Sequence, residues 1–353
     1  MARCTIRVVV ADDSALAREM LVQILASDDE IDVIGIATDG QEAIDLVAAL
    51  RPDLVTMDIH MPGVDGLKAI EHIMAFTPVP VLVVSSSVYG EGVGRAFDAL
   101  EAGALEVMKK PEPRDWADLQ DIAQDLIRRV KLLSRIPVIT HVRGMRSARP
   151  AGEAGGDAEA RRAGVRPEVV AIGSSTGGPS ALLNVLGRLP ADYSLPILVV
   201  QHIADGFVPG LVAWLDAGCK IRVVVAEDGM PVLPGVAYFA PTGANLTLER
   251  RRLRLHEPQV GQLYVPSANT LFESITVSCG PAGIGVILTG MGADGATGLK
   301  MMSDVGAMTI AQDEATSTVF GMPKAAAETG AAGLVLPVHD IAAELERVVS
   351  AAL

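Results

Sequence analysis

The chain has 353 residues, half of them hydrophobic and only 3% aromatic, a composition that suits two closely packed α/β domains. Its net charge of -14 argues against a nucleic-acid partner, because phosphate binding depends on clustered lysine and arginine. No segment approaches the roughly 18 apolar residues that span a bilayer, so we expect a cytoplasmic protein that is not inserted in a membrane.

Short apolar runs alternate with longer helical stretches from residue 6 to residue 133. The runs are too continuously apolar to be half-exposed, and they predict strands at 6–11, 32–37, 53–58, 79–85 and 104–109. Helical spacing lies between them, at 14–26, 41–50, 66–75 and 92–102. This alternation predicts a five-stranded, doubly wound, flavodoxin-like parallel sheet with the strand order 2-1-3-4-5.

Residues 134–167 lack sustained periodicity and are rich in Arg, Ala, Gly and Pro, which predicts a linker. This linker divides the chain into a first domain of residues 1–133 and a second of residues 168–353. The first domain carries 12 basic and 23 acidic side chains, whereas the linker carries 7 and 3. We expect the basic linker to act as a tether, the alternative being that the acidic first domain holds it.

A second α/β alternation begins at residue 168, with strands expected at 168–175, 195–202, 220–227, 284–292 and 307–312. The segment 235–257 breaks the rhythm with alternating residues around Gly and Asn, which indicates a β-hairpin insert. The prediction is a second doubly wound parallel sheet with a β-hairpin insert. The three cysteines, Cys4, Cys219 and Cys279, have no metal or disulfide spacing and are expected to be buried thiols.

Three carboxylates follow neighbouring strands of the first predicted sheet. Asp12 and Asp13 end the first strand, and Asp58 ends the third. Because strands 1 and 3 are neighbours in a 2-1-3 order, these side chains should converge in one crevice. Like charges that close cannot all stay ionised without a counter-ion, which favours Mg²⁺.

A hydroxyl and an ammonium complete this predicted crevice. Ser85 ends the fourth strand, and Lys110 ends the fifth. Together with a metal they could neutralise a phosphoryl group on Asp58. Taken alone, each of these residues has an ordinary explanation, such as a helix cap or a solvated loop cation, but five consistent strand ends favour a single site.

The motifs ADDS, MDIHMPGVDG, VVSS and KKP make residues 1–133 resemble a receiver domain of the two-component response regulators. The resemblance implies a cognate histidine kinase as phosphoryl donor and Mg²⁺ as cofactor. The roles it implies for this chain are phospho-acceptor for Asp58, metal-site acids for Asp12 and Asp13, metal ligand through the backbone carbonyl for His60, switch hydroxyl for Ser85 and phosphate-sensing cation for Lys110. Val107 stands where many chemotaxis receivers have an aromatic residue, which argues against an aromatic relay.

The stretch GSSTGGPS follows the first strand of the second domain and contains a cluster of hydroxyls. It lacks the lysine of a phosphate-binding loop but satisfies G-x-S-x-G, with Ser175 at the centre between a strand and a helix. A serine nucleophile needs a base and an orienting acid. His202 ends a strand at the same rim, whereas His256 belongs to the predicted hairpin and His339 begins the last helix.

The carboxylate expected at this rim is Asp294, which a glycine-rich turn delivers after the strand that begins near residue 284. Ser175, His202 and Asp294 thus come from three strand ends that a parallel sheet can bring together. Singly, the glycine motif is weak, the histidine is typical of a core or loop residue, and the aspartate is typical of a helix cap. Their order along the chain differs from that of the ordinary α/β-hydrolases.

The motifs IGSSTGG, QH, ILTGMGADG, AEDG, YFAP and FGMP make residues 168–350 similar to the catalytic domain of the chemotaxis protein-glutamate methylesterases, the CheB family. Receiver, linker and catalytic domain in this order match that family over essentially the whole chain. The resemblance implies Ser175 as nucleophile, His202 as general base, Asp294 as orienting acid and backbone amides near Thr176 and Met291 as oxyanion hole. Ser174 stands where alanine is more usual.

This resemblance implies hydrolysis of glutamate γ-methyl esters on chemoreceptors, with methanol released and with deamidation of receptor glutamine as a second activity. It implies no cofactor in the esterase domain, and activation by phosphorylation of Asp58. The alternative is a phosphorylation-controlled protein that binds receptors without hydrolysing anything. A DNA-binding regulator is disfavoured by the charge and by the absence of a helix-turn-helix signal.

Overall fold

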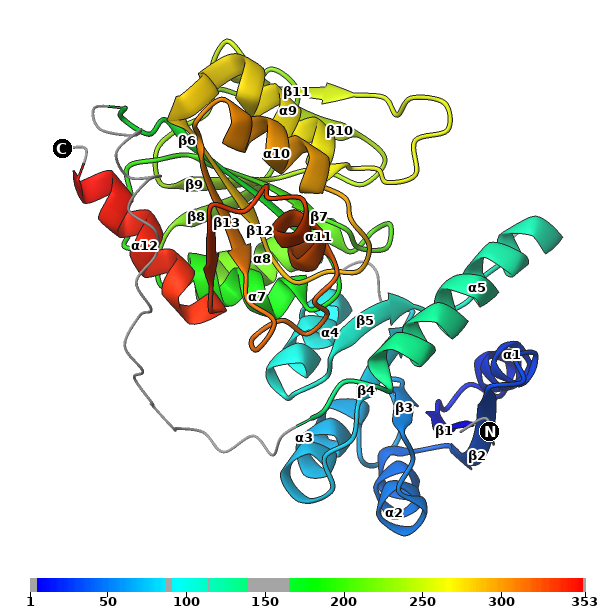
Figure 1. Cartoon of the computed structure of the whole chain (residues 1–353). Coiled ribbons are helices and arrows are strands. Elements are labelled where there is room, and N and C mark those ends of the chain that lie inside the picture. Colours follow the sequence, from blue (N-terminus) through cyan, green and yellow to red (C-terminus); the bar gives the residue numbers. More distant parts are fainter. Residues whose placement is uncertain (1–4, 87–90, 114, 139–164, 352–353) are drawn as a thin grey trace. The chain divides into compact units, whose positions relative to one another are not determined.

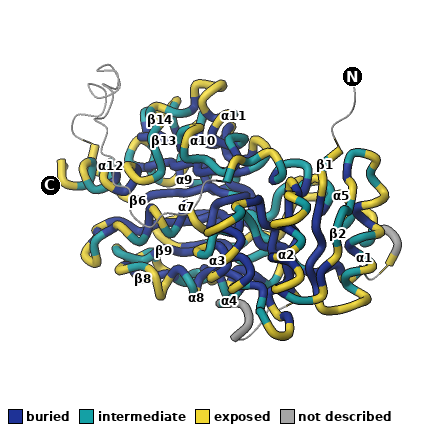
Figure 2. The backbone as a smooth tube through the Cα atoms, turned by 90° about the horizontal axis from the view of Figure 1, so that it is seen from below, coloured by how far each residue is buried: buried dark blue, intermediate teal, exposed yellow. Residues whose placement is uncertain are grey.

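The computed structural model describes residues 5–86, 91–113, 115–138 and 165–351. The chain forms two compact units, residues 1–148 and residues 149–353 (Figure 1). Most of the predicted linker, and Cys4, lie outside the described residues. In each unit, buried strands run inside and helices cover them (Figure 2). No helix among the described residues combines the length and apolar character needed to cross a membrane.

The first unit is built on one sheet of five parallel strands. They are β1 (Ile6–Ala11), β2 (Ile31–Ala37), β3 (Leu54–Met57), β4 (Val81–Ser85) and β5 (Glu106–Lys109). Their spatial order is β2-β1-β3-β4-β5, which confirms the predicted order 2-1-3-4-5 and makes β1 and β3 neighbours.

Helices cover both faces of this sheet, as a doubly wound fold requires. They are α1 (Ala15–Ala26), α2 (Gly40–Leu50), α3 (Gly66–Phe76), α4 (Glu91–Glu101) and α5 (Trp116–Leu133). Helices α1 and α5 pack together on one face, where Val8 and Val10 of β1 meet Leu21, Leu25 and Leu126. Helices α2, α3 and α4 form the layer on the other face (Figure 1).

The second unit is built on a sheet of seven strands, all of whose pairings are parallel. They are β6 (Val169–Ser174), β7 (Ile197–Gln201), β8 (Arg222–Val225), β9 (Val236–Phe239), β12 (Gly283–Ile287), β13 (Met308–Gln312) and β14 (Leu334–Leu336). Their order is β14-β13-β12-β6-β7-β9-β8, so the winding reverses between β6 and β12. In such sheets, ligands bind beyond the carboxyl ends of the strands at the reversal point.

Helices again cover both faces of the sheet. They are α7 (Gly178–Leu186), α8 (Val208–Gly218), α9 (Ala268–Cys279), α10 (Ala296–Asp304), α11 (Met322–Glu328) and α12 (Val338–Ala351), with a short 3-10 turn η1 (Gly280–Ala282). Helices α7, α8 and α12 form one layer, and α9, α10 and α11 form the other. The core under α9 joins Val169 and Ala171 of β6 to Leu271, Phe272 and Ile275.

The predicted β-hairpin is present, as β10 (Asn245–Glu249) and β11 (Arg252–His256), but it is shorter than the segment 235–257. The first part of that segment forms β9, a strand of the main sheet that pairs with β7 and β8. Its tyrosine and phenylalanine fit a fully buried parallel strand as well as a hairpin arm. The hairpin turns at Arg250 and Arg251, both with positive φ, and not at the Gly and Asn of the sequence pattern.

The expected burial of the thiols is only partly met. Cys219 and Cys279 are free and half-buried; Cys219 follows the last residue of α8, and Cys279 is the last residue of α9. Burial still raises the pKa of each thiol to about 11.

Candidate active site and receiver site

The acids of the first unit lie side by side at the carboxyl edge of its sheet. The backbone N–H of Asp58 donates to the carbonyl of Ala11 at 2.9 Å, which fixes the residue after β3 beside the residue after β1. Asp12 and Asp58 are buried, whereas the side chain of Asp13 is exposed. Carboxylate oxygens of the three residues lie within 4.8 Å of one another, as the sequence predicts.

Lys110 joins this cluster from the end of β5. Its ammonium lies 2.8 Å from Asp12 Oδ2 and 2.9 Å from Asp58 Oδ2. Burial, aided by the charge of Asp12, raises the pKa of the Asp58 carboxyl against the opposing effect of Lys110. Burial alone would lower the pKa of Lys110, but the hydrogen bonds and charges of the two carboxylates raise it above its ordinary value.

The cluster has the chemistry of a site for a hard cation. Its three carboxylates face one ammonium, so negative charge remains uncompensated. Asp12 Oδ2 is buried, and its contact with the Lys110 ammonium at 2.8 Å does not have the geometry of a hydrogen bond. Carboxylate oxygens are the ligands that Mg²⁺ prefers, so these residues fit that ion. His60 follows with an exposed side chain, and its backbone N–H donates to the Asp58 carboxylate.

Ser85 lies at the same edge, buried at the end of β4, and its carbonyl accepts a hydrogen bond from the N–H of Lys110 at 3.0 Å. Val107 is buried within β5. The structure therefore brings all the predicted receiver residues to one rim, each from the strand end that the sequence indicates.

The second site lies where the winding of the seven-stranded sheet reverses. Ser175 follows β6, and its N–H donates to the carbonyl of Thr289, which follows the neighbouring β12. Gly290 comes so close that a side chain there would place its Cβ 2.8 Å from Ser175 Cβ, so this position requires glycine. His202 follows β7, on the other side of β6, with its N–H bound to the carbonyl of Ser174 at 2.9 Å.

His202 and Asp294 form a direct pair, with 2.9 Å between the imidazole Nε2 and Asp294 Oδ2. The carboxylate is almost fully buried, with 1% of its side chain exposed, against 14% for the imidazole. Burial alone would raise the pKa of Asp294, but hydrogen bonds from His202, Ala268 N and Asn269 N hold it below its ordinary value. Asp294 therefore stays ionised at neutral pH and can fix the orientation of the imidazole.

Gln201 ties the serine and histidine turns together. Its Nε2 donates to the carbonyl oxygens of Ser175 and His202, both at 2.8 Å, and its Oε1 accepts from the Ser174 hydroxyl at 2.7 Å. Among the described residues, the Ser175 hydroxyl makes no hydrogen bond to the His202 ring. Such contacts are often open in unliganded sites and close when substrate binds.

Two backbone amides near Ser175 are available to an incoming oxygen. The N–H groups of Thr176 and Met291 donate to no acceptor within the described part of the chain. The Thr289 hydroxyl holds the first of these turns by donating to the carbonyl of Thr176 at 2.9 Å. It also accepts the N–H of Val319 at 2.9 Å, which ties a third segment to the same point. Unpaired amides beside a nucleophile are the donors that an oxyanion hole needs.

Sequence reasoning missed three groups that hold this site. Ser267 Oγ donates to Asp294 Oδ1 at 2.9 Å, and two N–H groups of the first turn of α9 also donate to the Asp294 carboxylate. Tyr264 stacks on the His202 ring. Gln201 stands in the QH motif but was given no role. A serine before an apolar helix signals a cap, so Ser267 had a sequence signal, whereas Tyr264 had none.

The other two histidines lie elsewhere. His256 is on the hairpin, where its Nε2 contacts Thr247 Oγ1 at 2.9 Å and Glu249 at 3.2 Å. His339 is in the first turn of α12, half exposed. Of the histidines in the second unit, His202 alone contacts Asp294 among the described residues.

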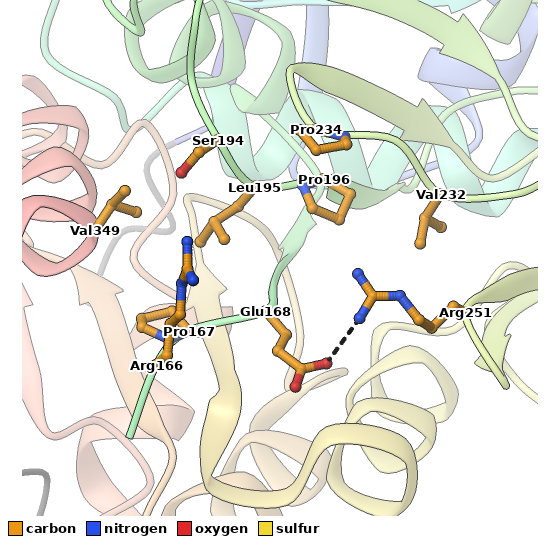
Figure 3. A pocket seen from close by; sticks show the side chains of 10 residues that line it. All are labelled: Arg166, Pro167, Glu168, Ser194, Leu195, Pro196, Val232, Pro234, Arg251 and Val349. Carbon is orange, nitrogen blue, oxygen red and sulfur yellow. Dashed lines mark ion pairs between the residues drawn. The ribbon is translucent and has the colours of Figure 1, made fainter. Parts of the chain in front are cut away.

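A cavity of about 270 Å³ opens at the opposite edge of the same sheet (Figure 3). Arg251 reaches toward Glu168 there, with 3.5 Å between the charged groups, and Pro196 and Val232 line the wall. Glu168 precedes β6 and Ser175 follows it, so at ~3.3 Å per residue the cavity lies roughly 20 Å from the serine. None of its lining residues belongs to the predicted catalytic set, so the cavity is separate from the serine site.

Fold and site together define a receiver-type unit joined to a doubly wound α/β unit that carries a serine, a histidine and an aspartate where the winding of its sheet reverses. Two family models match the chain: the response regulator receiver domain over residues 8–122 and the CheB methylesterase over residues 170–345. The chain belongs to the protein-glutamate methylesterase/protein-glutamine glutaminase family and is a hydrolase of that family.

Curated relatives match over nearly their full length. A protein-glutamate methylesterase/protein-glutamine glutaminase 2 from Anaeromyxobacter dehalogenans is 46% identical, with 95% of each chain covered. A protein-glutamate methylesterase/protein-glutamine glutaminase 1 from Syntrophus aciditrophicus is 44% identical, with 96% of each covered. Among solved structures, the CheB methylesterase catalytic domain of Thermotoga maritima is 36% identical with a TM-score of 0.49, over 52% of this chain and 100% of that one.

Proposed function

We propose that this protein hydrolyses glutamate γ-methyl esters on chemoreceptors under the control of phosphorylation, and that it also deamidates receptor glutamines. The names of its relatives support both reactions. The observation that carries the proposal is the His202–Asp294 pair, with 2.9 Å between Nε2 and Oδ2. Ser175 lies beside this pair, because the side-chain amide of Gln201 donates both to the carbonyl of Ser175 and to the carbonyl of His202.

In the proposed reaction, Ser175 Oγ attacks the ester carbonyl while His202 takes the serine proton. Because His202 Nε2 is bound to Asp294, the nitrogen that accepts this proton is Nδ1. The N–H groups of Thr176 and Met291 stabilise the oxyanion, and one such donor is worth about 3 kcal/mol of barrier. His202 then protonates the departing methoxide, so methanol leaves and an acyl-serine remains.

Water completes the cycle by the same steps in reverse order. His202 takes a proton from the water as it attacks the acyl group, and returns it to Ser175 Oγ when the glutamate carboxylate leaves. A glutamine side chain presents the same carbonyl, and ammonia then replaces methanol as the leaving group. Every proton transfer in this scheme uses groups of the chain, so we propose that the esterase domain needs no cofactor.

In the first unit, the proposed phospho-acceptor is Asp58. Mg²⁺ would be held by the carboxylates of Asp12, Asp13 and Asp58 and by the backbone carbonyl of His60. When bound, the ion supplies positive charge that neutralises the phosphoryl oxygens. Lys110 adds a second positive charge, since its ammonium already lies 2.9 Å from Asp58.

Ser85 is proposed as the switch hydroxyl that reports the phosphorylated state. A cognate histidine kinase would supply the phosphoryl group, and the reaction would take place in the cytoplasm on methylated receptors. We propose residues 1–133 as the receiver, 134–167 as the linker and 168–353 as the catalytic domain. A coupling of about 1–3 kcal/mol between receiver and active site would change activity 5- to 150-fold.

Methanol release from methylated receptor tests this proposal. The wild-type protein should release methanol, Ser175→Ala should not, and Asp58→Ala should keep basal activity but lose its stimulation by a phosphoryl donor. The rival is a receptor-binding protein without hydrolytic activity. Equal methanol release from wild type and Ser175→Ala would remove the triad assignment, and receptor binding without any release would favour the rival.

A further inference from the structure

An aromatic side chain covers the imidazole of the active site. The rings of Tyr264 and His202 lie 4.9 Å apart between centroids and only 7° from parallel, an offset stack. Tyr264 belongs to the segment between the hairpin and α9, far from His202 in sequence. The stack is thus a tertiary contact made by an irregular segment, on a ring whose edge is already bound to Asp294.

The segment that carries Tyr264 is anchored independently of this stack. The side-chain amides of Asn245 and Gln262 donate to each other's oxygens at 2.8 and 3.1 Å, and Gln262 Oε1 also accepts the N–H of Gln259 at 3.2 Å. Ser267 N donates to Asn245 Oδ1 at 3.0 Å, which ties the start of α9 to the same point. Removal of the Tyr264 ring should therefore leave the path of the segment intact.

The hydroxyl end of Tyr264 reaches the other side of the site. A Cβ placed on Gly292 would lie 2.6 Å from the Tyr264 hydroxyl oxygen, so the phenol packs directly against that glycine. Gly292 follows Met291, whose N–H is one of the two unpaired amides near Ser175. Tyr264 therefore contacts both the proposed base and the turn that carries one proposed oxyanion donor.

We propose that Tyr264 is a positioning residue for His202, an inference that rests on the proposed function. The bond to Asp294 selects which edge of the imidazole faces the carboxylate, but it leaves the ring free to tilt about that bond. The stack fixes the plane of the ring, so that Nδ1 is the nitrogen presented to Ser175. The electron-rich face of the phenol also stabilises the imidazolium that forms when His202 takes the serine proton.

This role belongs to the aromatic ring and not to the hydroxyl, which gives a matched pair of variants. In Tyr264→Leu, kcat for methanol release should fall about tenfold, the size of a favourable ring–cation contact, while KM stays within about twofold of wild type. In Tyr264→Phe, kcat should remain within about twofold of wild type. Val260→Ala, a fully exposed position on the same segment, is the control and should keep wild-type kcat.

The stack can also be tested by NMR, without measuring the enzymatic reaction. The chain has six histidines, so the ring protons of His202 can be assigned by NMR through comparison with His202→Gln. In wild type and Tyr264→Phe these protons should be shifted upfield by the aromatic ring, and in Tyr264→Leu the shift should disappear. Unshifted His202 protons in the wild type would overturn the stack whatever the activities are.

The outcomes separate this inference from the proposed function. Wild-type kcat in Tyr264→Leu, or an equal loss in Phe and Leu variants, would overturn the positioning role while an inactive Ser175→Ala still supports the esterase. An active Ser175→Ala would instead overturn the proposed function, and the NMR comparison would still decide whether the stack exists.

Discussion

Asp294→Asn should separate the two tasks of the Asp294 carboxylate, because it removes the charge while it keeps the shape. In the wild type this group accepts hydrogen bonds from His202 Nε2, Ser267 Oγ and the N–H groups of Ala268 and Asn269, at 2.7 to 3.2 Å. An amide has one acceptor oxygen and one donor nitrogen. At least one of the four donors would then face an N–H, and none would face a charge.

The expected loss of activity follows from the bond to the imidazole. Without the carboxylate, the His202 tautomer is no longer fixed and the imidazolium is not stabilised, so kcat should fall about 10³- to 10⁴-fold. Stability should fall as well, since hydrogen bonds to a charged group are worth about 1.5–3 kcal/mol each and part of this is lost. We expect the free energy of unfolding to decrease by about 2–4 kcal/mol at pH 7.

The loss of stability should depend on pH in a defined direction. The folded-state pKa of Asp294 lies below its ordinary value, so the carboxylate stabilises the fold above about pH 4. This contribution disappears as the pH falls through the folded-state pKa. The difference in unfolding free energy between wild type and Asp294→Asn should therefore be level above pH 5 and shrink below pH 4.

Urea unfolding at several pH values and methanol release at pH 7 measure the two effects. Ser267→Ala is the matched control, because it removes one hydrogen bond to Asp294 Oδ1 and the side-chain cap of α9 but leaves the bond to His202 in place. It should cost about 1–2 kcal/mol of stability and leave kcat within about fivefold of wild type. A kcat for Asp294→Asn within tenfold of wild type, or a stability difference that does not begin to shrink as the pH falls below 4, would refute this reasoning.

Three further predictions concern other parts of the chain. Gln201→Leu should lower kcat at least tenfold and destabilise the fold by about 2–3 kcal/mol, as measured by steady-state kinetics and urea unfolding. The reason is that the carbonyls of Ser175 and His202 both lose the amide donor that joins the Ser175 turn to the end of β7. Labelling of Asp58 by a small phosphoryl donor should require Mg²⁺ and be lost in Asp58→Asn, so label retained with a chelator would contradict the metal site. At pH 8, Cys219 and Cys279 should react with iodoacetamide more slowly than a free thiol, because burial raises their pKa to about 11; peptide mass spectrometry measures the rates.

Sequence reasoning located residues that follow regular strands and missed Tyr264, whose contact depends on the path of a loop. Asp12, Asp58 and Lys110 each follow a buried strand, and parallel strands must present their carboxyl ends at one edge. The same rule joins Ser175 to His202 across β6 and β7. The apolar periodicity of the sequence, and the polar residue that follows each apolar run, are thus enough to place a side chain at the carboxyl edge of a sheet.

Tyr264 could not be placed in this way. It precedes α9 in a segment without periodicity, and its contact with His202 depends on how the hairpin, that segment and α9 fold together. The short strand β14 was missed for a related reason. It has three residues, none of them buried, at the edge of the sheet, and so lacks the apolar run that marked the central strands.

The two sites show how one architectural position can serve two kinds of chemistry. In the first unit, burial and the charge of Asp12 raise the pKa of Asp58, and the carboxylates outnumber the single ammonium of Lys110. In the second, the single carboxylate of Asp294 is surrounded by donors, so its pKa is lowered and it persists as a fixed negative charge. The first arrangement suits a carboxylate, Asp58, that is stabilised when a cation or a phosphoryl group binds. The second suits a carboxylate, Asp294, that stays ionised while it holds the imidazole of His202. The opposite pKa shifts at the two sheet rims therefore fit the two proposed roles, phosphoryl acceptor for Asp58 and orienting acid for Asp294.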